Sequence, residues 1–285
     1  MSAAAAYLEL TKPRITWLVV FTAGAGFLAA APVSNVVGLV HTLLGTAFVA
    51  GGTNALNQWW ERDVDGRMRR TCRRPLPSGR LSARPALVFG VSIAAIGLAE
   101  LLVFANLLTA ALAALTLTSY VLVYTPLKRR TPLATLVGAV PGALPILGGW
   151  TAATGAVAPA AWALFGTLFL WQMPHFYALA WLYRDDYRRG GLAMISVFDA
   201  DGRRTGRGAL CYAAALVGVS VLPAAIGTAG GWYAAAALAL GAWLLGAGAA
   251  FARHPEVRAA RGLLLTSVIY LPLLLAFLVV DRLTV

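Results

Sequence analysis

Three oxygen-bearing side chains recur at four-residue intervals at the end of the second apolar stretch of this sequence. Asn57, Glu61 and Asp65 occupy positions i, i+4 and i+8, so a continuous helix would place all three on one face. One amide and two carboxylates form a set of hard oxygen donors of the kind that Mg²⁺ takes together with substrate phosphates. The alternative is a solvated helix end, in which Arg62 and Arg69 pair with the two carboxylates.

A dense run of arginines follows these carboxylates directly. Arg70 and Arg74 are two of eight arginines between positions 62 and 84, and Lys128 and Arg129 stand together in another polar segment. Guanidinium groups bind phosphate oxygens in a bidentate manner, and a divalent cation can bridge the same oxygens. Carboxylates beside guanidiniums therefore predict a diphosphate site with Mg²⁺. The sequence has no Walker-type glycine loop, which argues against nucleotide hydrolysis.

A second polar group interrupts the sixth apolar stretch. His175 follows Pro174, and a kinked backbone inside a span can open a cavity. His175 could serve as a general base, as an axial iron ligand or as a hydrogen-bonding core residue, and the sequence leaves these roles open. Asp185 and Asp186 follow at the end of the same stretch. We predict them as ligands of a second Mg²⁺, because two pseudo-equivalent helix ends could face one diphosphate.

The composition places these residues in a membrane protein. Of the 285 residues, 60% are hydrophobic and only 12% are charged, whereas a soluble domain carries about 25% charged residues. Apolar runs of about 20 residues are typical of spanning helices, and the alternating pattern of a membrane barrel is missing. We predict an all-α membrane protein with nine transmembrane helices around a central cavity. The predicted spans are residues 14–32, 36–60, 85–104, 107–125, 132–151, 159–183, 208–227, 231–251 and 262–280.

The charges indicate the orientation of these spans. Of the 23 Lys and Arg residues, 22 lie in the N-terminal segment or in the loops after the even-numbered spans, and only Arg282 lies on the other side. By the positive-inside rule the basic side is the cytoplasm, with the N-terminus inside and the C-terminus outside. Anionic membrane lipid accounts for part of the net charge of +12, and arginines confined to membrane loops do not predict nucleic-acid binding.

We expect a single domain over residues 1–285, with a faint pseudo-repeat that relates helices 1–4 to helices 5–8. A small-molecule transporter is a further alternative, but it would hide its ionisable groups near the bilayer midplane. Here Glu100, near the outer end of the third span, is the one acidic residue inside a span and away from the cytoplasmic boundary. This distribution disfavours transport.

Three stretches resemble the UbiA-type intramembrane prenyltransferases. Within this superfamily, they are most similar to the branch that farnesylates heme. They are Asn57-x3-Glu61-x3-Asp65 with Arg70 and Arg74, then Tyr124-Thr-Pro-Leu-Lys128-Arg129, and then Trp171-Gln-Met-Pro-His175-Phe with Asp185-Asp186-Tyr. The likeness covers the whole chain, and the third stretch is the specific one. Glu61 stands where the family often has Asp, and we expect its carboxylate to keep the metal.

The resemblance implies transfer of a farnesyl group from farnesyl diphosphate to a vinyl group of heme b, with addition of water, giving heme O. It also implies bound Mg²⁺, a plasma (inner) membrane location, an active site facing the cytoplasm, and a downstream heme-modifying oxidase as partner. The alternative acceptor is an aromatic acid or quinone precursor. The implied roles are Mg²⁺ binding by Asn57, Glu61 and Asp65, diphosphate binding by Arg70, Arg74, Lys128 and Arg129, and heme contact by His175, as iron ligand or as base for the water. The aromatic residues Trp59, Trp60, Phe176 and Tyr177 could form a water-poor wall or an interfacial aromatic belt.

Overall fold

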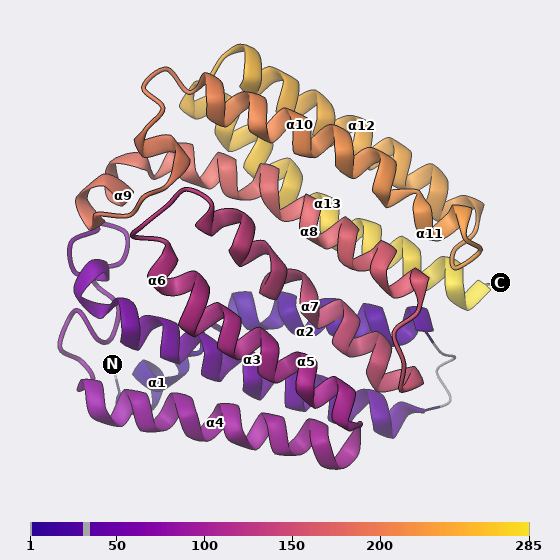
Figure 1. Ribbon diagram of the computed structural model, residues 1–285, viewed down its shortest axis with the longest axis horizontal. Helices are drawn as coiled ribbons and strands as arrows, with labels where there is room; N and C mark the ends of the chain where they lie inside the picture. The colour runs from indigo at the N-terminus through magenta and orange to yellow at the C-terminus, as the bar shows by residue number, and fades with distance from the viewer. Residues whose placement is uncertain (1, 31–34, 285) are drawn as a thin grey trace.

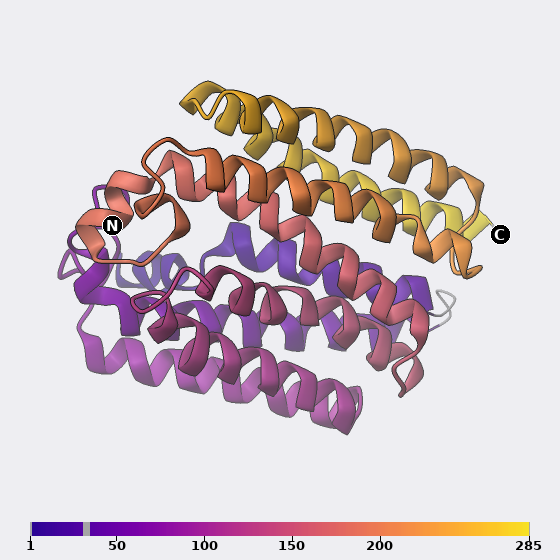
Figure 2. The ribbon, with the colours of Figure 1, turned by 45° about the horizontal axis from the view of Figure 1, so that its top comes forward.

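The computed structural model describes residues 2–30 and 35–284, and every regular element in these residues is helical. The long helices lie side by side along a common direction, with the loops at the two ends of the bundle (Figures 1 and 2). The elements are α1 (Ala3–Leu10), α2 (Pro13–Ala30), α3 (Val36–Asp65), α4 (Ala83–Phe104), α5 (Leu107–Thr118), the π-helical turn η1 (Ser119–Tyr124), α6 (Thr125–Leu127), α7 (Ala134–Thr154), α8 (Pro159–Leu182), α9 (Arg184–Gly190), the 3₁₀ turn η2 (Ile195–Val197), α10 (Arg203–Ser220), α11 (Leu222–Ala225), α12 (Gly231–Arg253) and α13 (Val257–Thr284).

The all-α membrane prediction is confirmed, and the count of nine spans stays a prediction. Within the described residues, eight helices are long and apolar enough to cross a membrane. The predicted span 159–183 corresponds to α8, a continuous helix of 24 residues, whose polar residues Gln172 and His175 lower its hydropathy. The predicted span 14–32 corresponds to α2, and its last two positions lie outside the described residues.

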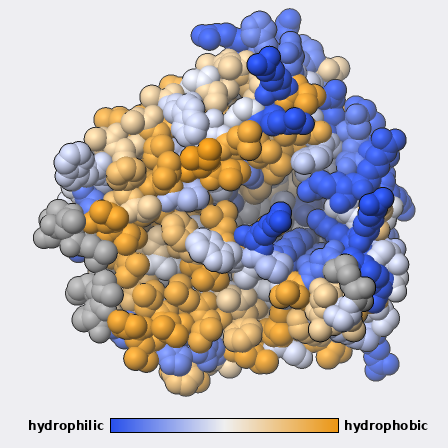
Figure 3. Space-filling view, turned by 180° about the vertical axis from the view of Figure 1, so that it is seen from behind, coloured by the Kyte–Doolittle hydropathy of each residue, from blue (hydrophilic) through white to orange (hydrophobic). Residues whose placement is uncertain are grey.

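The two ends of the chain lie at opposite ends of the bundle (Figures 1 and 2). The N-terminal end of the bundle also carries α9 and the loop that joins α3 to α4. Hydrophilic side chains gather at one end of the surface, while hydrophobic side chains cover most of the rest of the face seen in Figure 3. The bundle is therefore polar at one end and apolar along its length.

Small residues let the helices approach closely, as is usual inside membranes. A Cβ atom on Gly149 of α7 would lie 1.8 Å from the carbonyl oxygen of Ala23 in α2. A Cβ atom on Gly97 of α4 would lie 2.7 Å from the carbonyl oxygen of Gly45 in α3. Larger side chains at these two glycines would force apart the helix pairs that surround the site described below.

The acidic residue inside the third span has a partner. Glu100 of α4 lies 2.6 Å from Nδ1 of His41 in α3, and the His41 ring stacks on Phe104. This contact joins α3 to α4 far from the N-terminal end of the bundle. Glu100 is thus engaged in helix pairing, which agrees with the reasoning that disfavours transport.

The π-helical turn η1 interrupts the span that begins with α5. Such turns are rare, and they occur frequently at functional sites. The turn carries Tyr120 and Tyr124, and both side chains line the two cavities described below. The irregular backbone therefore places two aromatic residues where the bundle is hollow.

Candidate active site

The helix α3 continues without a break to Asp65, which confirms the predicted arrangement of the three oxygen donors on one face. Asn57, Glu61 and Asp65 are only 2%, 8% and 1% exposed. All three line a pocket of about 170 Å³ near the N-terminal end of the bundle. We call it the polar pocket.

Each carboxylate of the polar pocket has a cationic partner from outside α3. Lys128 Nζ donates to both oxygens of Glu61, at 2.9 and 3.1 Å. Arg74 Nη1 donates to Asp65 Oδ2 at 2.7 Å. Asn57 Nδ2 donates to Glu61 Oε2 at 2.9 Å, which orients that carboxylate further.

The alternative prediction is a solvated helix end in which Arg62 and Arg69 pair with Glu61 and Asp65. This alternative is wrong. The Arg62 side chain lies 3.9 Å from the exposed carboxylate of Asp63 and donates to the carbonyl of Trp59. The backbone N–H of Arg69 donates to Asp186. Glu61 and Asp65 are buried, and they are paired with residues that the loops bring back over the end of α3.

The sequence reasoning missed Lys12. Its Nζ donates to Asn57 Oδ1 at 3.0 Å, and its backbone has φ +48, the one positive value found for a non-glycine residue in the described chain. Burial, with the nearby cations of Arg74 and Lys128, lowers the pKa of Lys12 to about 7. In the sequence Lys12 and Arg14 both count toward orientation, so no local signal separates the half-buried lysine of the pocket from the exposed arginine.

The polar pocket carries more positive than negative charge. Burial would lower the pKa of Lys128, but the Glu61 carboxylate outweighs this effect and raises it, so Lys128 stays charged. Arg70, Arg74 and Lys128 outnumber the two carboxylates by one, and Lys12, whose pKa is about 7, adds a second positive charge when it is protonated. This excess favours an anion that can replace or bridge the existing partners. The charged lining residues are the cations Lys12, Arg70, Arg74 and Lys128 and the carboxylates Glu61 and Asp65.

Two of the predicted phosphate ligands differ in their placement. Arg70 lines the polar pocket, with its guanidinium 4.7 Å from the ring centroid of Tyr183. Arg129 is exposed and does not line the pocket, although it follows Lys128 directly. The chain turns at this point, so consecutive side chains point in different directions.

The structure does not bring Asp185 and Asp186 to the polar pocket. The helix α8 ends at Leu182 and α9 begins at Arg184, so the two carboxylates do not continue the α8 face that carries His175. Asp185 is exposed and lies 3.2 Å from Arg188. A second cluster of carboxylates at a helix end therefore does not face the first.

Asp186 instead fixes the loop that supplies the arginines. Its two oxygens accept the backbone N–H groups of Arg69 and Arg70, at 3.0 and 3.2 Å, and the Arg189 side chain also donates to it. Burial would raise the pKa of Asp186, but these hydrogen bonds outweigh burial and hold the pKa below its usual range. Asp186 acts as an anchor for the segment that contains Arg70 and Arg74.

The three donors on α3 suit a magnesium ion that is shared with a substrate. Among the described residues, no three or more His, Cys, Asp and Glu side chains form a group that could hold a metal ion. Asn57, Glu61 and Asp65 offer one amide oxygen and two carboxylates, which matches the preference of Mg²⁺ for one or two carboxylates plus phosphate oxygens. They do not form a closed site made of protein ligands alone.

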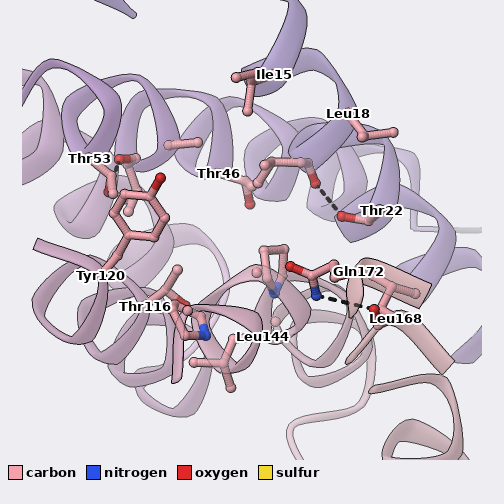
Figure 4. A pocket seen from close by; sticks show the side chains of 18 of the residues that line it. Ile15, Leu18, Thr22, Thr46, Thr53, Thr116, Tyr120, Leu144, Leu168 and Gln172 are labelled. Atoms are coloured by element: carbon pink, nitrogen blue, oxygen red, sulfur yellow. Dashed lines mark hydrogen bonds between the residues drawn. The ribbon is translucent and has the colours of Figure 1, made fainter. Parts of the chain in front are cut away.

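A larger cavity of about 340 Å³ adjoins the polar pocket. Its lining is mainly apolar, and Tyr120 and Gln172 project toward it from η1 and α8 (Figure 4). The cavity and the polar pocket share lining residues and are therefore contiguous. The shared residues are Ile15, Tyr120, Tyr124, Phe176 and Leu179.

The aromatic wall differs from the one expected. Of the four predicted residues, Phe176 lines both hollows, while Trp59, Trp60 and Tyr177 line neither. Trp60 is 43% exposed. Tyr120 and Tyr124 provide the wall instead, because η1 turns them inward.

His175 lines the larger cavity from α8. Its Nδ1 lies 2.9 Å from Ser267 Oγ on α13, and its ring stacks on Trp171, one helical turn earlier, with centroids 5.4 Å apart. The predicted site residues on α3 therefore line the polar end of one continuous cavity, and His175 on α8 lines its apolar end.

A cationic pocket that opens into an apolar cavity inside a helical bundle suits one class of ligand, an anionic head group with a long apolar tail. The fold and the site together define a membrane protein that holds such amphiphiles between its helices. Residues 18–279 match the model of the UbiA prenyltransferase family. The chain belongs to this family.

Named relatives extend over nearly the whole chain. The protoheme IX farnesyltransferase of Solibacter usitatus is 47% identical over 286 residues, which cover 97% of this chain and 98% of the relative. The protoheme IX farnesyltransferase of Myxococcus xanthus is 47% identical over 276 residues, which cover 96% and 94%.

Solved structures share the fold at low sequence identity. A structure of digeranylgeranylglyceryl phosphate synthase superimposes with a TM-score of 0.83 at 18% identity and covers all of both chains. A UbiA homologue from Archaeoglobus fulgidus, bound to GPP and Mg²⁺, gives a TM-score of 0.71 at 18% identity, with 98% of this chain and 100% of that chain covered. The helical arrangement is therefore that of intramembrane prenyltransferases.

Proposed function

We propose that the protein transfers a farnesyl group from farnesyl diphosphate to a vinyl group of heme b, with addition of water, to give heme O. The observation that carries this proposal is the likeness to the protoheme IX farnesyltransferases, which extends over 97% of the chain at 47% identity. The acceptor rests on this likeness. The donor chemistry rests also on the polar pocket and on the adjoining apolar cavity.

The polar pocket would hold the diphosphate. Lys12, Arg74 and Lys128 would donate hydrogen bonds to its oxygens and stabilise the negative charge that grows as the carbon–oxygen bond of farnesyl diphosphate breaks. Arg70 would add a fourth cation from the rim. Lys12, Arg74 and Lys128 now bond the α3 donors, so substrate binding would exchange these protein partners for phosphate oxygens.

Asn57, Glu61 and Asp65 would hold Mg²⁺ when the diphosphate is bound. The ion supplies Lewis-acid stabilisation of the leaving group. The oxygen-only donor set on one helix face supports this assignment, as does the A. fulgidus homologue with its bound GPP and Mg²⁺. In this proposal Asp185 and Asp186 have no ligand role, because Asp186 anchors the loop and Asp185 faces solvent.

The larger cavity would take the farnesyl chain and keep water from the allylic cation. The bond between farnesyl C1 and oxygen breaks and leaves its electron pair on the diphosphate. The vinyl carbon of heme then forms the new bond to C1. The resulting cation beside the porphyrin is captured by water, which loses a proton. A mainly apolar lining with Tyr120, Tyr124 and Phe176 at the junction limits early hydrolysis.

The topology that we propose has nine spans, with the active site facing the cytoplasm of a plasma (inner) membrane. Eight apolar helices together with α8 give an odd number of crossings, which agrees with chain ends at opposite ends of the bundle. The bias of basic residues supports a cytoplasmic N-terminus. The pseudo-repeat of helices 1–4 and 5–8 and a downstream heme-modifying oxidase as partner remain parts of the proposal.

The test is mass spectrometry of the hemes formed by the purified protein in lipid vesicles with heme b, farnesyl diphosphate and Mg²⁺. We expect a hydroxyethylfarnesyl heme whose formation stops when Mg²⁺ is chelated. An active preparation that prenylates an aromatic acid or quinone precursor and leaves heme unchanged would refute the proposed acceptor. The variant Asp65→Asn serves as the inactive control.

A further inference from the structure

His175 is held by a hydrogen bond between its Nδ1 and a buried serine hydroxyl. Its Nδ1 lies 2.9 Å from the hydroxyl oxygen of Ser267, a fully buried residue of α13. The Ser267 hydroxyl has a single proton, and it donates that proton to the carbonyl of Leu264 at 2.7 Å. With that donation made, the hydroxyl accepts from the imidazole, so the histidine proton lies on Nδ1 and Nε2 keeps a lone pair. A hydroxyl proton turned toward His175 would give the opposite tautomer, and the contact to Leu264 favours the first arrangement.

A second contact holds the same ring. Trp171 and His175 are one turn apart on α8, and their rings stack at 29° with centroids 5.4 Å apart. The indole Nε1 of Trp171 donates to the backbone carbonyl of Ser267 at 2.7 Å. Ser267 therefore fixes the imidazole directly and also through the tryptophan.

The free nitrogen belongs to a residue that lines the larger cavity. Among residues 2–30 and 35–284, no hydrogen bond reaches Nε2 of His175, and no carboxylate contacts the ring. In a catalytic triad an aspartate stabilises the imidazolium that the general base becomes, and His175 has no such neighbour among these residues. A serine hydroxyl offers only a dipole, whereas a neutral imidazole with an oriented Nδ1–H is the usual form of a metal ligand.

We propose that Ser267 is a positioning residue that holds His175 as the Nδ1–H tautomer, so that Nε2 ligates the iron of the heme acceptor in the cavity. This inference rests on the proposed function, because it takes an iron porphyrin as the second substrate. It selects iron ligation from the three roles that the sequence leaves open for His175. The hydrogen bond from Nδ1–H makes Nε2 a stronger donor toward iron.

The test is resonance Raman spectroscopy and heme titration of the full-length protein in lipid nanodiscs, with heme b and no farnesyl diphosphate. We expect the ferrous complex to show an iron–histidine stretching band that is absent in His175→Ala and returns when free imidazole is added. In Ser267→Ala we expect the band at lower frequency and heme binding weakened about 10- to 100-fold, the range for loss of such an outer hydrogen bond. Ser267→Thr keeps a hydroxyl and should restore both values.

Ser220→Ala is the matched control, because Ser220 is also fully buried and its hydroxyl donates to the carbonyl of Val217 in its own helix rather than contacting His175. It should match the wild type. The inference is overturned if the wild type shows no iron–histidine band, if the band persists in His175→Ala, or if Ser267→Ala matches Ser220→Ala. Since no farnesyl transfer occurs in this measurement, failure of the proposed reaction would be seen separately, in the mass spectrometry of products.

Discussion

Variants of the buried ion pair between Glu61 and Lys128 can separate an effect on turnover from an effect on the free energy of unfolding. The variant Lys128→Met would leave the Glu61 carboxylate, whose side chain is 10% exposed, without the ammonium that lies 2.9 Å away. Removing one partner of a buried pair costs about 3–5 kcal/mol. Because Asn57 still donates to Glu61 at 2.9 Å, we expect a loss near 3 kcal/mol. Loss of one donor to the developing charge should also lower turnover about 10²–10³-fold.

The double variant Glu61→Gln with Lys128→Met removes both charges. We expect its unfolding free energy to return close to that of the wild type, since no buried charge is left unpaired, while its turnover stays low because both functional groups are missing. Stability is measured by thermal unfolding in detergent, and turnover by mass spectrometry of the farnesylated heme. Arg129→Met is the control, since Arg129 is the exposed neighbour outside the polar pocket, and it should retain activity.

A double variant that regains activity would refute the catalytic role of the pair. A Lys128→Met variant as active as Arg129→Met would refute the assignment of Lys128 to the diphosphate. Strong loss of turnover in Arg129→Met would instead favour the sequence-based assignment over the structural placement.

Three further predictions concern the metal, the arginine loop and helix packing. Asp65→Asn should abolish the Mg²⁺-dependent formation of product, and a Mg²⁺ titration of turnover that matches the wild type would contradict the metal assignment. The pKa of Asp186 is depressed in the folded protein. Its ionised side chain therefore stabilises the fold above the ordinary Asp pKa of about 3.9, and this stabilisation is lost as the pH falls through the folded pKa. Asp186→Asn should remove this pH-dependent contribution from a plot of melting temperature against pH. Gly149→Ala should destabilise the α2–α7 contact by about 1–3 kcal/mol, because the new Cβ would meet the Ala23 carbonyl oxygen at 1.8 Å, and unchanged thermal unfolding would contradict the close approach.

Local periodicity predicts the part of the site that lies on one helix. Asn57, Glu61 and Asp65 converge as expected because α3 is unbroken, and the spacing alone determines a shared face. The partners Arg74 and Lys128 were predicted from their chemistry, although their pairing with particular carboxylates depends on how two loops fold back. Lys12 escaped prediction because its position depends on an unusual backbone angle between α1 and α2.

The carboxylates after the sixth span show the opposite error. Asp185 and Asp186 follow a long apolar helix, as the α3 carboxylates do, so the sequence suggests a second metal-binding helix end. The helix instead stops at Leu182, and the short helix α9 turns Asp186 toward the backbone of the arginine loop. The apolar pattern locates the end of a helix only to within a turn or two. The last residue of the helix is decided by tertiary hydrogen bonds, which the pattern does not predict.

The location of the polar pocket at the helix ends has an electrical consequence. Lys12 precedes α2, Asp65 is the last residue of α3, and Lys128 directly follows α6. The diphosphate can therefore bind and leave at one membrane surface, while the part of the substrate that enters the bundle is uncharged. Moving one elementary charge across the membrane costs about 2.3 kcal/mol per 100 mV, and in the proposed site farnesyl diphosphate carries no charge through the hydrocarbon. We therefore expect the binding of farnesyl diphosphate in sealed vesicles not to respond to an imposed membrane potential.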